Sequence, residues 1–102
     1  MKRRLRILPE AAEELTAAAE WYEERRPGLG VELIATLDGA LEEILASPTT
    51  FAFWARDYRK LVVRRFPYVV FFRLVGDDVE VVAFAHARRR PGYWVERTRR
   101  PR

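Results

Sequence analysis

The apolar residues of this chain change their spacing once, close to Ser47 and Pro48. Before that point they recur every three or four residues, as on one face of a helix. After it they form Val-, Phe- and Tyr-rich segments of about eight residues, which is typical of strands. A chain with this pattern folds as helices followed by a sheet, and 102 residues suit one such domain.

Two amphipathic helices are predicted in the first half. The first runs from Glu10 to about Arg26, after Pro9, and its apolar stripe consists of Ala11, Leu15, Ala18 and Tyr22. The second starts near Leu29 and ends at Ser47, and its stripe consists of Leu33, Leu37, Ala40, Leu41 and Ile44. The short link with Pro27, Gly28 and Gly30 predicts an antiparallel helical hairpin. Gly39 costs about 1 kcal/mol relative to alanine unless it allows close packing.

Four strands are predicted around this hairpin. They cover residues 3–8, 58–65, 68–75 and 79–87, with a turn at Gly76-Asp77-Asp78, whereas residues 49–57 are expected to form a loop on the core. The strand 68–75 is apolar on both faces, which predicts a central position in the sheet. The fold class is therefore α+β, in the order β-α-α-β-β-β, with the hairpin packed on a small, mainly antiparallel sheet. Residues 1–97 are predicted to form the domain and residues 98–102 a frayed basic tail, with Tyr93-Trp94 docked.

The net charge of +4 results from segments of opposite sign. Residues 10–50 hold ten acidic side chains against two arginines, whereas residues 51–75 hold six basic side chains against Asp57. Residues 88–102 add seven arginines against Glu96. We therefore expect an acidic helical part and a basic part formed by the sheet and the C-terminal segment.

The chain contains few of the residues that form common catalytic sites. The chain has no cysteine, one histidine (His86) and one serine (Ser47), so thiol chemistry, a cysteine or histidine metal site and a serine nucleophile are not expected. Neighbouring pairs such as Glu13-Glu14 point in different directions on a helix and suit a solvated acidic face. No cofactor and no metal are predicted. Because the basic N-terminus is not followed by an apolar stretch, we expect a cytoplasmic protein without a membrane segment.

One group of basic and aromatic side chains could carry a function. It consists of Lys60, Arg64, Arg65, Arg73, His86, Arg88, Arg89 and Tyr93. Such residues could surround a phosphodiester and supply an acid, a base and charge stabilisation without a metal, as a ribonuclease needs. The same residues suit a docking surface for an acidic partner, or a solvated sheet face with one hydrogen-bonded histidine.

Several motifs occur in an order that resembles a known family. They are Trp21-Tyr22, Arg26-Pro27-Gly28-Leu29-Gly30, Pro48 with Phe51, Arg59, Phe66-Pro67-Tyr68, and residues 84–94 with the sequence Phe-Ala-His-Ala-Arg-Arg-Arg-Pro-Gly-Tyr-Trp. From about Leu5 to Trp94 the chain resembles the RelE/ParE toxin superfamily, and most closely its ParE-like branch, also called plasmid stabilisation proteins. As single residues, Trp21, Tyr22, Phe66, Tyr68 and Trp94 are interpreted as packing residues.

The resemblance implies the toxin of a type II toxin-antitoxin pair, held in a hetero-oligomer by its antitoxin. ParE-branch toxins act on DNA gyrase, whereas RelE-branch toxins cut mRNA on the ribosome, and a shared fold does not choose between them. We predict a toxin that works by binding rather than by catalysis. The predicted partner-binding residues are Arg59, Lys60, Arg64, Arg65, Arg73, Arg88, Arg89 and Arg90. The alternative is a ribosome-dependent endoribonuclease that uses His86, Arg64 or Arg65, and Tyr93.

Overall fold

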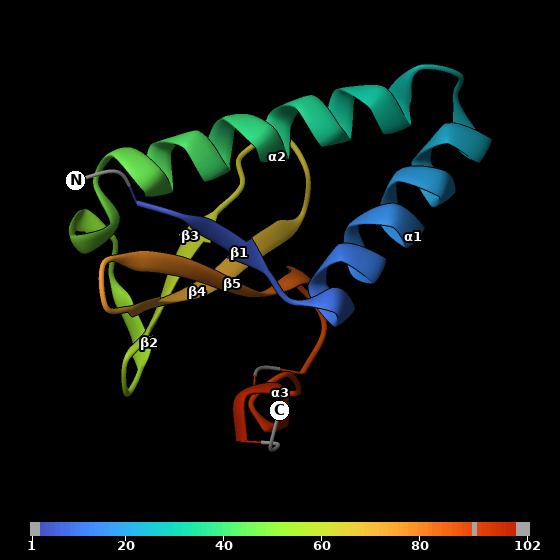
Figure 1. The fold of residues 1–102 in the computed structure, drawn as a ribbon. Helices are drawn as coiled ribbons and strands as arrows, with labels where there is room; N and C mark the ends of the chain where they lie inside the picture. The colour runs from blue at the N-terminus through green and yellow to red at the C-terminus, as the bar shows by residue number, and fades with distance from the viewer. Residues whose placement is uncertain (1–2, 91, 100–102) are drawn as a thin grey trace.

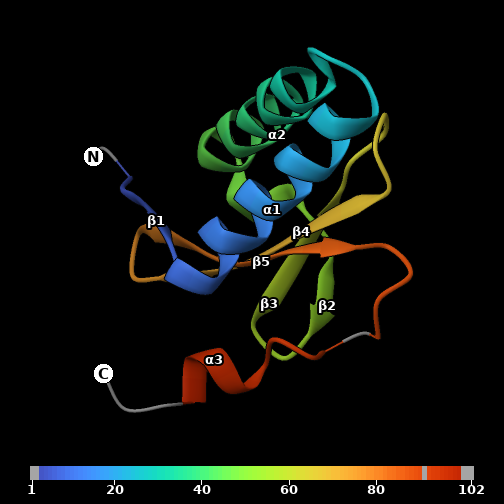
Figure 2. The ribbon, with the colours of Figure 1, turned by 90° about the vertical axis from the view of Figure 1, so that its right-hand side faces the viewer.

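The fold places a helical hairpin on one face of a five-stranded sheet and the C-terminal segment on the other. The computed structural model describes residues 3–90 and 92–99. Its elements are β1 (Leu5–Ile7), α1 (Pro9–Arg25), α2 (Leu29–Ala46), the 3-10 turn η1 (Pro48–Thr50), β2 (Phe53–Ala55), β3 (Tyr58–Val62), β4 (Tyr68–Val75), β5 (Asp78–His86) and α3 (Glu96–Arg99). Figure 1 shows the two helices joined by their short turn, and Figure 2 shows the sheet between them and the C-terminal segment.

The strands follow the order β1-β5-β4-β3-β2. β1 lies parallel to β5, and the other three pairs are antiparallel, so the predicted α+β fold is confirmed. β4 is the central strand, as its two apolar faces predicted. Between Phe71 and Phe72 of β4 the register with β5 shifts, so that Val82 is an extra residue on β5.

The main core lies between the hairpin and the sheet. The predicted α2 stripe is buried throughout, and Val70, Phe72 and Phe84 meet it from the sheet. The predicted α1 stripe also packs on this core: Ala11 and Ala18 are buried, and Leu15 and Tyr22 are partly buried. Both helix predictions are therefore confirmed.

A second, smaller core covers the opposite face of the sheet. Trp94 is fully buried there, and its ring packs against those of Tyr58, Phe71 and Trp54, with centroids 4.7, 4.7 and 5.2 Å away. The predicted docking of the C-terminal aromatic residues is confirmed.

Two local predictions are wrong, and the condition stated for Gly39 is not met. Residues 49–57 do not form only a loop, because η1 and β2 lie there and β2 adds a fifth strand. Thr98 and Arg99 are not frayed but lie in α3, and the Thr98 hydroxyl is hydrogen-bonded to that of Tyr58; residues 100–102 lie outside the described residues. Gly39 does not serve close packing, since a Cβ atom there would meet nothing within 4 Å.

Gly30 is the glycine that lets the helices approach. A Cβ atom at Gly30 would lie 2.4 Å from the carbonyl oxygen of Ala19 on α1. The backbone N–H of Gly30 also donates to a carboxylate oxygen of Glu23 at 3.0 Å, and that of Gly28 donates to the other oxygen at 2.7 Å. Glu23 thus replaces the missing backbone partners at the start of α2.

Candidate partner-binding site

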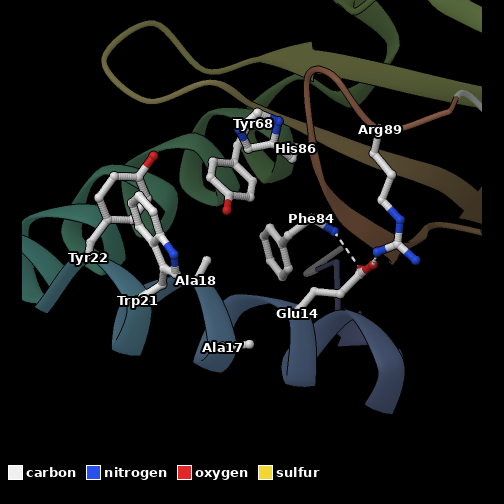
Figure 3. A pocket seen from close by; sticks show the side chains of 9 residues that line it. All are labelled: Glu14, Ala17, Ala18, Trp21, Tyr22, Tyr68, Phe84, His86 and Arg89. Carbon is white, nitrogen blue, oxygen red and sulfur yellow. Dashed lines mark hydrogen bonds and ion pairs between the residues drawn. The ribbon is translucent and has the colours of Figure 1, made fainter. Parts of the chain in front are cut away.

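A groove of 340 Å³ runs between α1 and the sheet, beside the start of β4 and the end of β5. It is lined by Glu14, Ala17, Ala18, Trp21, Tyr22, Tyr68, Phe84, His86 and Arg89, which we call the α1 groove. Figure 3 shows these side chains, with the aromatic rings toward one end and Glu14 and Arg89 toward the other. The groove is therefore apolar along most of its length and polar at one end.

The α1 groove owes its space to small residues on the helix. Ala17 and Ala18 face it, and the larger Trp21 and Tyr22 follow one turn later. Trp21 is 50% exposed, and the guanidinium carbon of Arg25 lies 3.6 Å from the Trp21 ring centroid. Trp21 also packs edge-on against Tyr22, with ring centroids 5.0 Å apart, so it lies at the border of the core with half of its side chain exposed.

The polar end of the groove is organised by Glu14. Both of its carboxylate oxygens accept hydrogen bonds from Arg97, at 2.8 and 2.9 Å, and the Phe84 backbone N–H donates to Oε1 at 3.2 Å. The Tyr93 hydroxyl also donates to Glu14, and Arg89 lies 3.5 Å away. Glu14 therefore joins α1, β5 and the C-terminal segment.

The same contacts complete the exposed edge of β5. β1 pairs with β5 only from Val79 to Val81, so β5 continues beyond its neighbour. There Arg97 donates to the carbonyl of Val82 at 3.0 Å, and Glu14 accepts from Phe84. Side chains thus satisfy backbone groups that no strand reaches.

These contacts change two ionisation equilibria. Burial raises the pKa of Tyr93 above its usual range, and the hydrogen bond to Glu14 raises it further. The hydrogen bond to Glu14 also raises the pKa of Arg97. Tyr93 is therefore a neutral phenol and Arg97 a cation at physiological pH.

His86 lies in the wall between the α1 groove and a second cavity. Its Nδ1 accepts a hydrogen bond from the Arg88 backbone N–H at 3.1 Å, and its ring meets that of Tyr68 edge-on at 5.3 Å between centroids. Because Nδ1 is an acceptor, the neutral imidazole carries its proton on Nε2.

The second cavity, of 160 Å³, has basic side chains around an aromatic floor. Lys60, His86, Arg89, Arg90 and Tyr93 line it, together with Trp54, Phe71 and Trp94. The structure therefore brings together Lys60, Arg89 and Arg90 of the predicted partner-binding residues, and His86 and Tyr93 of the predicted ribonuclease residues.

The other predicted site residues lie elsewhere. Arg64 lines a separate groove beside α2, Arg65 pairs with Glu32 of α2, and Arg88 lines none of these three hollows. The hydrogen bond from Arg65 lowers the pKa of Glu32, so this pair is charged. The four predicted ribonuclease residues are therefore split between two regions.

Arg73 and Arg59, two further predicted binding residues, also have structural partners. Arg73 donates to buried Glu80 at 2.9 Å. Arg59 donates to the carbonyl oxygens of Phe51 at 2.8 Å and Thr49 at 3.2 Å, and so fastens the segment before β2.

Glu14 is the residue that the sequence analysis missed. It was assigned to a solvated acidic face, yet its side chain is only 14% exposed. Its spacing could have indicated its burial, because Glu14 lies three residues after Ala11 and four before Ala18, on the buried stripe of α1. An acid within an apolar stripe indicates a buried cationic partner.

Neither a metal-binding cluster nor a membrane-spanning helix occurs in the described part of the chain. Residues 3–90 and 92–99 contain no group of three or more His, Cys, Asp or Glu side chains placed to hold a metal ion. None of the helices in these ranges combines the length and the apolar composition needed to cross a membrane.

The chain is similar to known toxins. The family model described as "ParE toxin of type II toxin-antitoxin system, parDE" matches residues 5–91. A solved structure described as "Chromosomal ParDE TA system from P. aeruginosa" superposes with a TM-score of 0.74 at 17% identity, over 83% of this chain and 96% of that chain, which supports the fold. No curated protein matches the chain. The predicted resemblance is confirmed, and the chain belongs to the family of ParE toxins of type II toxin-antitoxin systems.

Proposed function

We propose that this ParE-family chain arrests growth by binding DNA gyrase, and that an antitoxin encoded beside it neutralises it in the cytoplasm. The observation that carries the proposal is the family match over residues 5–91. The target and the neutralisation are those that membership of the ParE branch implies.

The arrangement of charged groups favours binding over catalysis. Arg65 pairs with Glu32 on α2, away from the Tyr93 hydroxyl, which donates to Glu14. A phenol whose pKa is raised by burial is a poor general base at neutral pH. Of the predicted ribonuclease residues, His86 and Tyr93 thus lie around one cavity, whereas Arg64 and Arg65 lie beside α2.

The α1 groove suits an antitoxin segment. Its floor of Ala17, Ala18 and Phe84 can take apolar side chains, and exposed Trp21 offers a large contact surface. Arg89 at the polar end can meet an acidic residue of the segment.

The second cavity favours one alternative. Lys60, His86 and Tyr93 line it over an aromatic floor, which is a suitable place for a ribonucleotide. A ribosome-dependent endoribonuclease would then act there, with Arg89 in place of Arg64 and Arg65.

Two sets of variants test these functions. Induction of the wild-type chain should stop growth, and co-expression of the product of the adjacent reading frame should restore it. Trp21→Ala should weaken that rescue with little loss of stability, because the side chain is exposed.

His86→Ala and Tyr93→Phe should remain toxic. Loss of toxicity in both folded variants, with mRNA cut on ribosomes in the wild type, would support the enzyme instead.

A further inference from the structure

The free edge of β3 lies open beside α2. β2 pairs with β3 only through Phe53 with Arg59 and Ala55 with Tyr58, and the Lys60 N–H reaches the carbonyl of Ala52 at 3.1 Å. Beyond Lys60, β3 has a neighbour on one side only, β4.

The backbone of Val62 points away from β4. The Val63 N–H donates to the Tyr68 carbonyl at 2.9 Å, so Val63 faces β4 and the preceding residue faces outward. Val62 lies opposite Val69, and its side chain is 61% exposed. Within residues 3–90 and 92–99, no group bonds to its outward N–H or C=O.

This edge forms one wall of a groove of 430 Å³. Residues 60–64 line it continuously with Phe51, and α2 contributes Thr36, Gly39, Ala40 and Glu43. We call it the α2 groove. Since a Cβ atom at Gly39 would meet nothing within 4 Å, the α2 side leaves room for an added chain.

The charges along the edge specify the kind of chain that fits. Lys60 and Arg64 border the groove on the β3 side, where in the described part of the structure neither forms an ion pair, and Glu43 of α2 borders it on the opposite side. A second copy of the edge would bring these cations against each other, which disfavours self-pairing. An acidic segment would gain two attractive contacts.

We propose that an extended, acidic segment of the antitoxin adds to the sheet at the free edge of β3, by hydrogen bonds with the backbone of Val62. The inference rests on the proposed neutralisation by an antitoxin, and it adds a backbone contact to the side-chain contacts of the α1 groove. Backbone pairing fixes the segment's position, and Lys60 and Arg64 select its charge.

A backbone variant tests the pairing. Val62→Pro removes the outward N–H, which β4 does not use, whereas Val62→Ala keeps it. With the antitoxin from the adjacent reading frame as the probe, Val62→Pro should raise the dissociation constant roughly tenfold, as expected for one lost hydrogen bond and an unpaired acceptor. Val62→Ala should change it little. In the wild-type complex, the Val62 amide should become protected from hydrogen exchange.

A second variant separates binding from folding. Gly39→Leu should stabilise α2, because leucine is the better helix former, and yet weaken binding by filling the α2 groove. Gly39→Ala adds one methyl group and should retain binding.

Arg64→Glu should weaken binding more than Arg56→Glu, since Arg56 lies in the turn between β2 and β3, outside this groove.

The outcomes distinguish the two proposals. If the antitoxin does not bind the wild-type chain, the proposed neutralisation fails. If it binds the wild type, Val62→Pro and Gly39→Leu equally, or the Val62 amide stays unprotected, the edge pairing is overturned. A dimer of the toxin alone that protects Val62 would show a second copy on this edge and would also overturn it.

Discussion

At the scale of single residues, Glu14 makes the contacts that join α1 to β5 and to the C-terminal segment. One carboxylate receives hydrogen bonds from Arg97, Tyr93 and the backbone of Phe84, so it fastens the C-terminal segment to the rest of the fold. Sequence reasoning identified the stripe around it but not its role, because the partners lie about 70 or more residues away in the chain. Long-range pairing of this kind leaves no local pattern.

Glu14→Gln is expected to destabilise the fold by about 3 kcal/mol, because removal of one charge leaves a mostly buried Arg97 without its counter-ion. Glu13→Gln changes an exposed neighbour and should cost less than about 0.5 kcal/mol. Urea unfolding of the two variants measures the difference. Equal stabilities would show that Glu14 does not hold the C-terminal segment.

Gly30→Ala is expected to destabilise the helical hairpin by about 1–3 kcal/mol, because its methyl group would overlap the Ala19 carbonyl. Gly39→Ala should instead stabilise the protein by up to about 1 kcal/mol, since its methyl group is unobstructed and alanine favours a helix. Thermal unfolding should therefore shift in opposite directions. A shift of the same sign for both would contradict the assigned close approach.

Alkaline pH should reveal the raised pKa of Tyr93. The unfolded chain loses this proton near pH 10, whereas the folded state retains it, so the stabilisation is complete below about pH 10 and is lost above it. Tyr93→Phe should therefore lose less stability than the wild type as the pH rises through this range. Identical pH dependence of the free energy of unfolding would exclude the effect.

At the scale of elements, the sequence predicts the helices and strands that have a clear apolar period. It misses the short elements that depend on tertiary contacts. α1, α2 and β4 agree closely with the predictions because each has a long apolar pattern of one period. β2 has three residues, too few to show a period, and Arg59 supports the segment before it through the carbonyls of Thr49 and Phe51. α3 has four residues and carries no apolar stripe; the Thr98 hydroxyl bonds to that of Tyr58.

The sequence predicted which types of residue the candidate site contains, but it did not predict which of them lie together. The basic residues of the sheet and tail were identified, and Lys60, Arg89 and Arg90 do meet around one cavity. Arg65 and Arg73 were included because of their charge, yet each has an acidic partner in the fold, and Arg89 also lies 3.5 Å from Glu14. Only tertiary structure distinguishes a cation that is paired from one that is available.

The C-terminal segment should contribute to stability through one side chain. Trp94→Ala is expected to cost about 3–5 kcal/mol, because a fully buried ring is removed from the second core. Trp21→Ala is the matched control, and its half-exposed ring should cost far less. Chemical unfolding compares them; a small loss for Trp94→Ala would mean that the segment does not stabilise the sheet.

At the scale of the whole molecule, the charge is divided between two parts. The residues of α1 and α2 are predominantly acidic, and the sheet and C-terminal segment carry most of the basic side chains. The structure pairs some of these across the boundary, as in Glu14 with Arg97 and Glu32 with Arg65. A partner that approaches the basic side therefore meets a stronger field than a net charge of +4 indicates.

Addition of purified wild-type chain to a gyrase supercoiling assay and to translating ribosomes tests most directly whether this ParE-family protein acts by binding gyrase. The account predicts inhibition of supercoiling, relief of that inhibition by the antitoxin, and intact mRNA on the ribosomes. Unaffected supercoiling together with cut mRNA would contradict it and would place the activity in the cavity lined by His86 and Tyr93.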